Sequence, residues 1–367
     1  QGAEMIPRCA LLVLLLTVLT KAALGAEPLV REGTIALPGT SGRIDHMAVD
    51  LDRRRLFVAE LGNGSVDVID LVRGKVIYRI PNLDEPQGVA YVTKTDRLTV
   101  ASGGDGTLKF YDGSNYAPRG VLKLGDDADN VRPGPGENDV TVGYGSGALA
   151  IVDTATARKI GEIELVAHPE SFQISLAADR VFINVPDAHE IAVADIKHRK
   201  QIANWTPPNL SSNFPMALGP GNSIAVVFRS QSKLVKFDTL SGSTVAATST
   251  CGDADDVFFD TRRQRFYVSC GTGFVDVFEA DNLSRIGHIA TAWGARTSLY
   301  VPELDRFYVA ARAGLLGSNA SIMIYRPLPS EGARHDRNHR QDSNSLARRP
   351  PDARGGHTIQ QSPPPHF

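Results

Sequence analysis

Short hydrophobic runs separated by turn residues repeat along most of this chain. Within residues 45–81, tight-turn residues such as Asp, Asn and Gly separate four runs rich in Val, Ile, Phe and Tyr: His46–Val49, Leu56–Ala59, Val66–Asp70 and Val76–Ile80. This pattern predicts a four-stranded antiparallel meander. Such a meander cannot bury both of its faces alone, so it needs neighbouring copies stacked against it.

Two series of polar positions count the copies. The residue that opens the first strand recurs every 41 to 43 residues: Asp45, Gln87, Asp129, Glu170, Asn213, Asp255 and Arg296. The residue that closes the third strand recurs every 41 to 47 residues: Asp70, Asp112, Asp153, Asp195, Asp238, Glu279 and Arg326. Both series give seven units. We interpret the aspartates of the second series as structural acceptors for N–H groups of the following turn.

The repeat length predicts the architecture. A four-strand repeat of about 40 residues is typical of a β-propeller blade. The seventh unit ends after its third strand, at Tyr325, whereas a spare strand, Gly33–Leu37, precedes the first unit. We therefore predict an all-β, seven-bladed β-propeller with four-stranded blades, in which the N-terminal strand completes the last blade and closes the ring.

The amino-acid sequence of the repeats also resembles that of a known family. The YVTN-type repeats of the YncE-like periplasmic seven-bladed propellers are similar to RRRLFVAELGNGSVDVIDLVRGKVIYRI, residues 53–80, and to ALAIVDTATARKIGEI, residues 148–163. The resemblance covers roughly residues 33–326. It implies the propeller fold and a periplasmic location, and it names no activity. No blade ends in the Trp-Asp pair of WD40 repeats.

The two ends of the sequence differ from the repeats. After Met5, a positive charge at Arg8 and the apolar run Cys9–Leu19 precede small residues up to Ala26. This order is typical of a secretory signal peptide. We expect residues 1–26 to be the signal peptide, with residues 1–4 as an upstream extension. The mature protein is then periplasmic or secreted, with no membrane span.

Composition sets the remaining boundaries. The propeller is expected over residues 27–326, and the Pro-, Arg- and Ser-rich residues 327–367 have too few apolar side chains to order themselves. The formal net charge of −2 gives no support for nucleic-acid binding. We expect a monomer. Outside the signal peptide the sequence has two cysteines, Cys251 and Cys270, which either form a disulfide on one face of the sixth blade or remain free thiols.

The first strands of propeller blades line the central channel, so their opening residues gather around one mouth. We predict that this mouth binds a ligand through Asp45, His46, Gln87, Asp129, Asn130, Glu170, Asn213, Asp255, Asp256 and Arg296. Clustered carboxylates raise the pKa of some members unless a cation or ligand neutralises them. The alternative is that these side chains only face channel water.

The connections between second and third strands reach the same mouth. They contribute Glu60, Asp105, Tyr144, Asp187, Arg229 and Arg312, as ligand contacts or as ordinary hairpin residues. His46 and His168 lie near strand starts. Each is either a functional residue, as a base or a ligand, or a structural residue held by hydrogen bonds.

A divalent cation is a further possibility at the mouth. The oxygen atoms of Asp129, Glu170, Asn213 and Asp255 suit Ca²⁺ or Mg²⁺ better than a soft metal. The set is similar in kind to the calcium site of gluconolactonase-type propellers, where the metal polarises a lactone carbonyl. We infer no other cofactor.

Motifs that would identify an enzyme do not occur in the sequence. It contains no HExxH, paired CxxC, GxSxG or Walker motif, so we assign no catalytic residue. We therefore predict an exported binding or scaffold module that holds a small molecule or a protein partner at the channel mouth. The alternative is a metal-assisted lactonase or other hydrolase.

Overall fold

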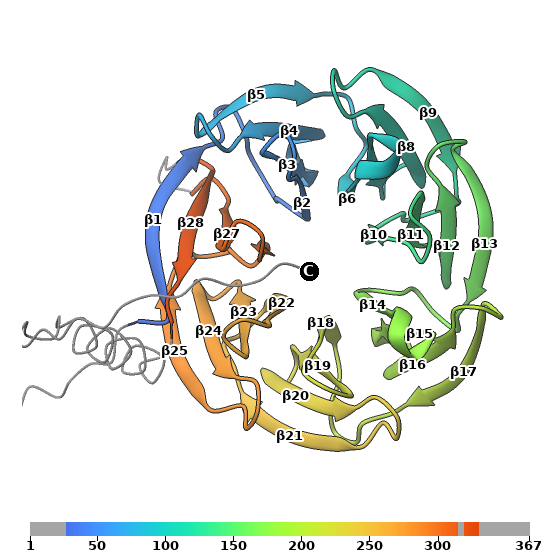
Figure 1. The fold of residues 1–367 in the computed structure, drawn as a ribbon, viewed down its shortest axis with the longest axis vertical. Helices are drawn as coiled ribbons and strands as arrows, with labels where there is room; N and C mark the ends of the chain where they lie inside the picture. Colours follow the sequence, from blue (N-terminus) through green and yellow to red (C-terminus); the bar gives the residue numbers. More distant parts are fainter. Residues whose placement is uncertain (1–26, 315–318, 330–367) are drawn as a thin grey trace, which may run out of the picture.

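The computed structural model describes residues 27–314 and 319–329. The predicted signal peptide, residues 1–26, lies outside the described residues, as does nearly all of the predicted tail. Within the described residues, 28 strands form seven separate four-stranded antiparallel sheets. The sheets are arranged as blades around a central axis (Figure 1). The prediction of an all-β, seven-bladed propeller is confirmed.

The first strand of each blade lies closest to the axis (Figure 1). The lengths of these strands range from three to seven residues. They are β2 (Met47–Asp50), β6 (Pro86–Val92), β10 (Val131–Pro133), β14 (Phe172–Ser175), β18 (Asn213–Leu218), β22 (Ala254–Asp260) and β26 (Ser298–Val301).

The two middle strands of each blade form its buried body, and nearly all of their residues are buried. The second strands are β3 (Arg55–Glu60), β7 (Arg97–Ser102), β11 (Asp139–Tyr144), β15 (Arg180–Val185), β19 (Ser223–Phe228), β23 (Arg265–Cys270) and β27 (Arg306–Ala311). The third strands are β4 (Ser65–Asp70), β8 (Thr107–Asp112), β12 (Ala148–Asp153), β16 (Glu190–Asp195), β20 (Lys233–Asp238), β24 (Phe274–Glu279) and β28 (Ser321–Pro327).

The outermost strands form the rim of the ring and alternate exposed with covered residues. They are β1 (Leu29–Ala36), β5 (Lys75–Ile80), β9 (Pro118–Lys123), β13 (Arg158–Glu164), β17 (Lys200–Trp205), β21 (Thr244–Ser249) and β25 (Arg285–Ala290). Four single-turn 3₁₀ helices occupy hairpin connections: η1 (Leu61–Asn63), η2 (Thr93–Thr95), η3 (Leu176–Ala178) and η4 (Pro186–Ala188).

The N-terminal strand closes the ring. β1 pairs with β28 in the sheet order β1-β28-β27-β26, with Thr34 opposite Met323. In Figure 1 it forms the outer edge of the blade that ends the chain. The closing strand is therefore confirmed, although it begins at Leu29 rather than at the predicted Gly33. A register shift between Arg31 and Gly33 separates the two halves of the strand.

The described chain continues past the predicted end of the propeller at residue 326. β28 ends at Pro327, and the Leu328 N–H donates to the Pro28 carbonyl at 2.8 Å. The Arg265 guanidinium also donates to the Leu328 carbonyl, at 2.8 Å. Residues 327 and 328 therefore pack with the propeller.

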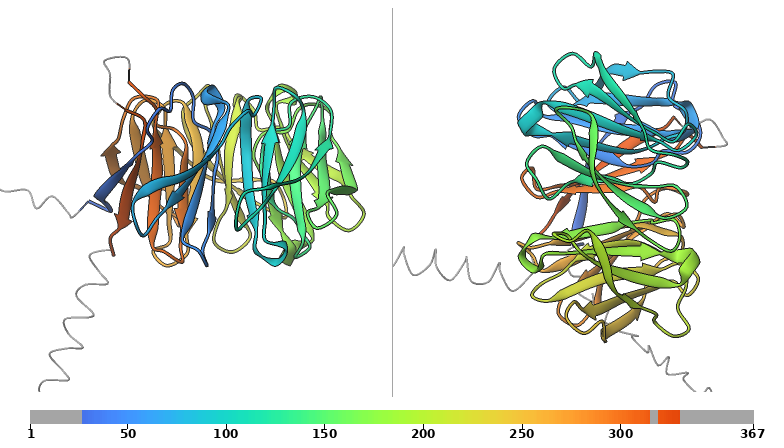
Figure 2. Two further views of the ribbon diagram at one scale, coloured as in Figure 1. Left: turned by 90° about the horizontal axis from the view of Figure 1, so that it is seen from above. Right: turned by 90° about the vertical axis from the view of Figure 1, so that its right-hand side faces the viewer.

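Hydrophobic side chains fill the spaces between adjacent blades. Around the closure, Ile35 of β1 packs in one cluster with Met47, Leu56 and Ile322. This cluster joins the last blade to the first, so burial holds the closure as well as the strand pairing. Figure 2 shows the result from the side, with the blades packed face to face around the ring.

The aspartates that end the third strands have the structural role that their spacing predicts. Asp70 Oδ1 accepts from the N–H groups of Val72 and Arg73, at 2.9 and 2.8 Å. Equivalent bonds to turn N–H groups are made by Asp112, Asp153, Asp195 and Asp238. These carboxylates are therefore committed to turns at the end of the channel opposite the mouth.

Candidate functional site at the channel mouth

The loops that enter the first strands and the hairpins that leave the second strands meet at one end of the channel. Backbone hydrogen bonds join them: Gly62 to Arg43 at 2.9 Å and Gly271 to Asp253 at 2.8 Å. The same connection recurs in other blades. It joins Gly103 to Glu85, Gly145 to Asp126 and Arg229 to Ser212, so the described residues show it in five of the seven blades.

Asp45, His46 and Asp129 are close together inside the mouth. His46 Nε2 lies 3.9 Å from Asp45 Oδ1 and 3.9 Å from Asp129 Oδ1. Arg43 pairs with Asp45 at 2.9 Å. Burial raises the pKa of Asp45 and of Asp129, and neighbouring carboxylates raise the pKa of Asp129 further. Burial also lowers the pKa of His46, so burial disfavours the charged form of all three side chains, whereas Arg43 favours the ionised form of Asp45.

Asp255 behaves differently from the other carboxylates. Its Oδ1 pairs with Arg229 and its Oδ2 lies 3.1 Å from Arg296 Nε. Burial alone would raise the pKa of Asp255, but Arg229 and Arg296 outweigh it and lower this pKa. Asp255 is therefore an ionised carboxylate held between two guanidinium groups.

Asp256, the next residue, faces a different environment. Its Oδ2 accepts from the Ser298 N–H at 2.6 Å. Burial, together with the charge of Asp255, raises the pKa of Asp256 to about 8. The structure thus predicts a protonated Asp256 at neutral pH, where it links the first strands of the last two blades.

The remaining predicted mouth residues are held by their neighbours. Gln87 donates to Asp127 Oδ1 at 3.0 Å, on the rim of the mouth. Asn213 donates to Asn184 Oδ1 at 3.0 Å and to the Glu190 carbonyl at 2.9 Å. Asn130 is buried, and its backbone carbonyl accepts a hydrogen bond from the Gly143 N–H at 2.9 Å.

Glu170 and His168 lie on the side of the mouth opposite Arg296. Burial raises the pKa of Glu170, and the nearby charge of His168 opposes this increase. His168 Nδ1 is 2.6 Å from the Gly145 carbonyl, which fixes the ring against the neighbouring hairpin. These contacts give His168 a structural role.

The four residues considered for a metal do not form a common coordination group. Asp255 forms ion pairs with two arginines, and the side-chain N–H group of Asn213 donates to Asn184. Among the described residues, no group of three or more His, Cys, Asp or Glu side chains has an arrangement that could hold a metal ion. A Ca²⁺ or Mg²⁺ site there stays a prediction from sequence.

The hairpin residues expected at the mouth divide into two groups. Glu60 accepts from Thr40 and Ser65 at 2.6 Å each, and Asp105 accepts from Lys109 at 2.6 Å. Tyr144 likewise bonds Glu162 within its own blade. Arg229 and Arg312, in contrast, face the mouth. Arg229 stacks on the Phe214 ring, with its guanidinium carbon 3.8 Å from the ring centre.

A pocket of about 280 Å³ opens at the mouth beside Arg296. Its walls come from the loops around β2, β22, β23, β26 and β27, so three adjacent blades contribute. Three arginines line it, Arg43, Arg296 and Arg312, together with Asp253 and Trp293. The Trp293 side chain is 74% exposed although it is the largest apolar group of the pocket.

Arg43 and Trp293 were not among the residues predicted from the repeat. Both lie in loops ahead of a first strand, outside the repeated positions, so strand periodicity does not select them. The available signal is composition: Trp293 is one of two tryptophans in the chain, and it lies next to Gly294 in a loop. Gly294 has φ of 77°, a backbone conformation that favours glycine.

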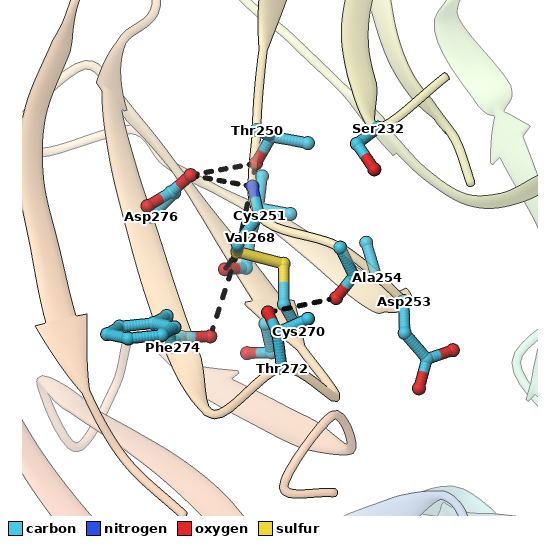
Figure 3. The surroundings of a disulfide bond; sticks show 12 residues. Ser232, Thr250, Cys251, Asp253, Ala254, Val268, Cys270, Thr272, Phe274 and Asp276 are labelled. Atoms are coloured by element: carbon cyan, nitrogen blue, oxygen red, sulfur yellow. Dashed lines mark hydrogen bonds between the residues drawn. A yellow bond between two sulfur atoms is a disulfide. The ribbon is translucent and has the colours of Figure 1, made fainter. Parts of the chain in front are cut away.

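A disulfide braces two segments of this pocket. The structure joins Cys251, three residues before β22, to Cys270, the last residue of β23, with Cα atoms 5.8 Å apart. Figure 3 shows the bond between the loop that carries Asp253 and the hairpin that carries Thr272. The Thr272 hydroxyl also donates to the Gly252 carbonyl at 3.2 Å.

Comparisons with known proteins support the fold alone. No family model matches the sequence, and no curated protein matches it. A chain in the "Crystal Structure of Mitotic Checkpoint Complex" is similar in structure, with a TM-score of 0.68, 15% sequence identity, and coverage of 81% of this chain and 91% of that chain. Separately, no helix in residues 27–314 or 319–329 has the length and apolar character needed to cross a membrane.

Proposed function

We propose that this chain is a binding module that holds a ligand or a partner chain at the channel mouth. The observation that carries the proposal is the pocket formed by Arg43, Arg296, Arg312 and Trp293. Convergent polar groups beside an exposed aromatic ring are typical of a binding site. Arg43 and Arg296 of the pocket pair with aspartates of the mouth, whereas Trp293 is exposed to solvent.

The structural neighbour adds support for a protein-binding role. Its chain belongs to a protein complex, and the likeness concerns the fold at 15% identity. A propeller presents a rigid rim of loops, on which binding residues are positioned by the strands beneath. Fold alone names no partner, so the pocket residues carry the proposal.

We also propose that the protein is exported and is related to the YncE-like propellers. The apolar run at residues 9–19 and the amino-acid sequence of the repeats support this proposal. The Cys251–Cys270 disulfide fits an oxidising compartment. When the protein is treated with an alkylating agent in its host cells, neither of the two cysteines should react until a reductant is added. Alkylation without reductant would contradict export.

A ligand-observed NMR screen of the full chain tests the binding function. The screen uses a fragment set balanced in cationic, neutral and anionic members, together with short peptides. Binding should be lost in the double variant Trp293→Ala/Arg312→Gln. It should persist in Arg119→Gln/Val121→Ala, which replaces an arginine and an exposed apolar residue on the outer strand β9. No binding, or binding unaffected by the mouth variant, would overturn the proposal.

A further inference from the structure

We propose that the pocket at the mouth binds a carboxylate attached to a flat apolar group, with the carboxylate on Arg312 and Arg296 and the apolar group on Trp293. This inference rests on the proposed binding function and names the class of ligand. It follows from the charges around the pocket, from the position of Arg312 and from the exposed tryptophan.

The charges around the pocket leave one arginine without a carboxylate. Arg43 pairs with Asp45 at 2.9 Å, and Arg296 pairs with Asp253 at 2.8 Å. Arg229 and Arg296 share Asp255. Four arginines thus face three aspartates. Among residues 27–314 and 319–329, no acidic side chain lies within ion-pair distance of Arg312.

Arg312 is held over the backbone of the loop that carries Trp293. A Cβ atom at Gly294 would lie 2.4 Å from Arg312 Nε and 2.7 Å from its guanidinium carbon. Glycine at this position therefore leaves the space that the guanidinium group occupies. The planar guanidinium fork suits two parallel hydrogen bonds to a carboxylate.

Trp293 provides the apolar part of the site. A Cβ atom at Gly273 would lie 3.3 Å from the Trp293 backbone nitrogen, so the backbone of Trp293 packs closely on this hairpin. Trp293 is nevertheless 74% exposed, and it lines the pocket with Arg312 and Arg296. An aromatic or other flat group on this ring removes apolar surface from water at little entropic cost. A volume of about 280 Å³ admits a ligand of the size of a substituted benzene ring.

Two sources can supply such a carboxylate: a free small molecule, or the C-terminal carboxylate of a partner peptide. Both present the same chemistry to Arg312. Benzoate represents the first source, and N-acetyl-phenylalanine represents the second. Benzamide and N-acetyl-phenylalaninamide are their neutral counterparts, with nearly the same shape.

Trp293 itself reports on the binding. The chain contains two tryptophans, and Trp205 packs on the far side of the ring against Phe182, with ring centres 5.5 Å apart. The variant Trp205→Phe therefore leaves Trp293 as the single tryptophan. In this background, each acid should change the emission saturably, and each amide should bind about tenfold or more weakly. The acid with the lower Kd identifies the source.

A second pair of variants tests the role of Arg312. Arg312→Gln should weaken binding of the acids by about tenfold or more and leave the amides unchanged. Arg73→Gln, an exposed arginine in the turn between β4 and β5, should change neither. Equal affinity for acid and amide, or no effect of Arg312→Gln, would overturn the ligand class. In that case, binding of neutral or cationic fragments at Trp293 would still support the binding function.

Discussion

At the scale of single residues, Asp255 and Asp256 show how position decides the charge of a buried carboxylate. Asp255 lies between Arg229 and Arg296, and these cations lower its pKa against the effect of burial. Asp256 accepts a hydrogen bond from the Ser298 N–H, and burial raises its pKa to about 8. Two adjacent aspartates therefore have opposite pKa shifts, because their side chains contact different neighbours.

The raised pKa of Asp256 predicts a pH dependence of stability. Between pH 3.8, which is the ordinary pKa of an aspartate, and about pH 8, Asp256 keeps a proton in the folded protein that it releases in the unfolded chain. The free energy of unfolding should therefore fall as pH rises through this window, by about 1.4 kcal/mol per pH unit and about 6 kcal/mol in total. In Asp256→Asn this dependence should disappear, because the amide keeps the acceptor for Ser298 without titrating.

Denaturation with urea at several pH values between 5 and 8 measures this effect. The quantity to compare is the difference in free energy of unfolding between wild type and Asp256→Asn. Subtraction removes the contribution of the other titrating groups. A difference that stays constant across the window would show that Asp256 is ionised in the folded protein.

At the scale of elements, the strand pattern determined the blades, and the loops between them were not predictable in the same way. The runs Leu56–Ala59 and Val66–Asp70 fall within β3 and β4 because their side chains are buried on both faces of the blade. The predicted closing strand began at Gly33, after the observed start of β1 at Leu29, because Arg31 and Glu32 interrupt the apolar pattern on the exposed rim. A loop residue such as Trp293 follows no strand period, so its place in the pocket needed the structure.

Removal of the closing strand should strongly destabilise the ring. Deletion of Leu29–Ala36 exposes β28 and removes Ile35 from the cluster that joins the last blade to the first. We expect the Tm to fall by more than about 10 °C. Circular dichroism during heating measures the change. Removal of residues 331–367 is the control and should leave the Tm unchanged, while an equal Tm after both deletions would contradict closure by β1.

Loss of the disulfide should also lower stability, by a smaller amount. The bond between Cys251 and Cys270 closes a loop with a sequence separation of 19. Loop-closure entropy predicts a loss of about 3 kcal/mol for the double variant Cys251→Ala/Cys270→Ala. Reductant should destabilise wild type and leave the double variant unaffected. If urea unfolding of wild type does not respond to reductant, the two cysteines are not joined in solution.

At the scale of the whole molecule, the ring places buried charges inside the channel and solvent-facing binding groups at one mouth. The residues of the repeat ladder lie within two positions of the observed starts of the first strands, and only Asn213 is itself a first residue. The structure brings Asp45, His46 and Asp129 near one another, and the charge of Asp255 acts on His46. The sequence placed Arg296 and Arg229 at the mouth, but it could not predict that both pair with Asp255, since those contacts join different blades. The pocket beside Arg296 likewise depends on three blades at once.

The most direct test of this account is to locate a bound carboxylate in a crystal of the full chain. Soaking with 4-bromobenzoate places a bromine atom whose anomalous scattering marks the ligand. We predict a peak in the pocket over Trp293, with the carboxylate on Arg312 and Arg296 and no peak there in Arg312→Gln. A peak elsewhere on the ring, or an empty pocket at a saturating concentration, would contradict the assignment of the mouth as a carboxylate-binding site.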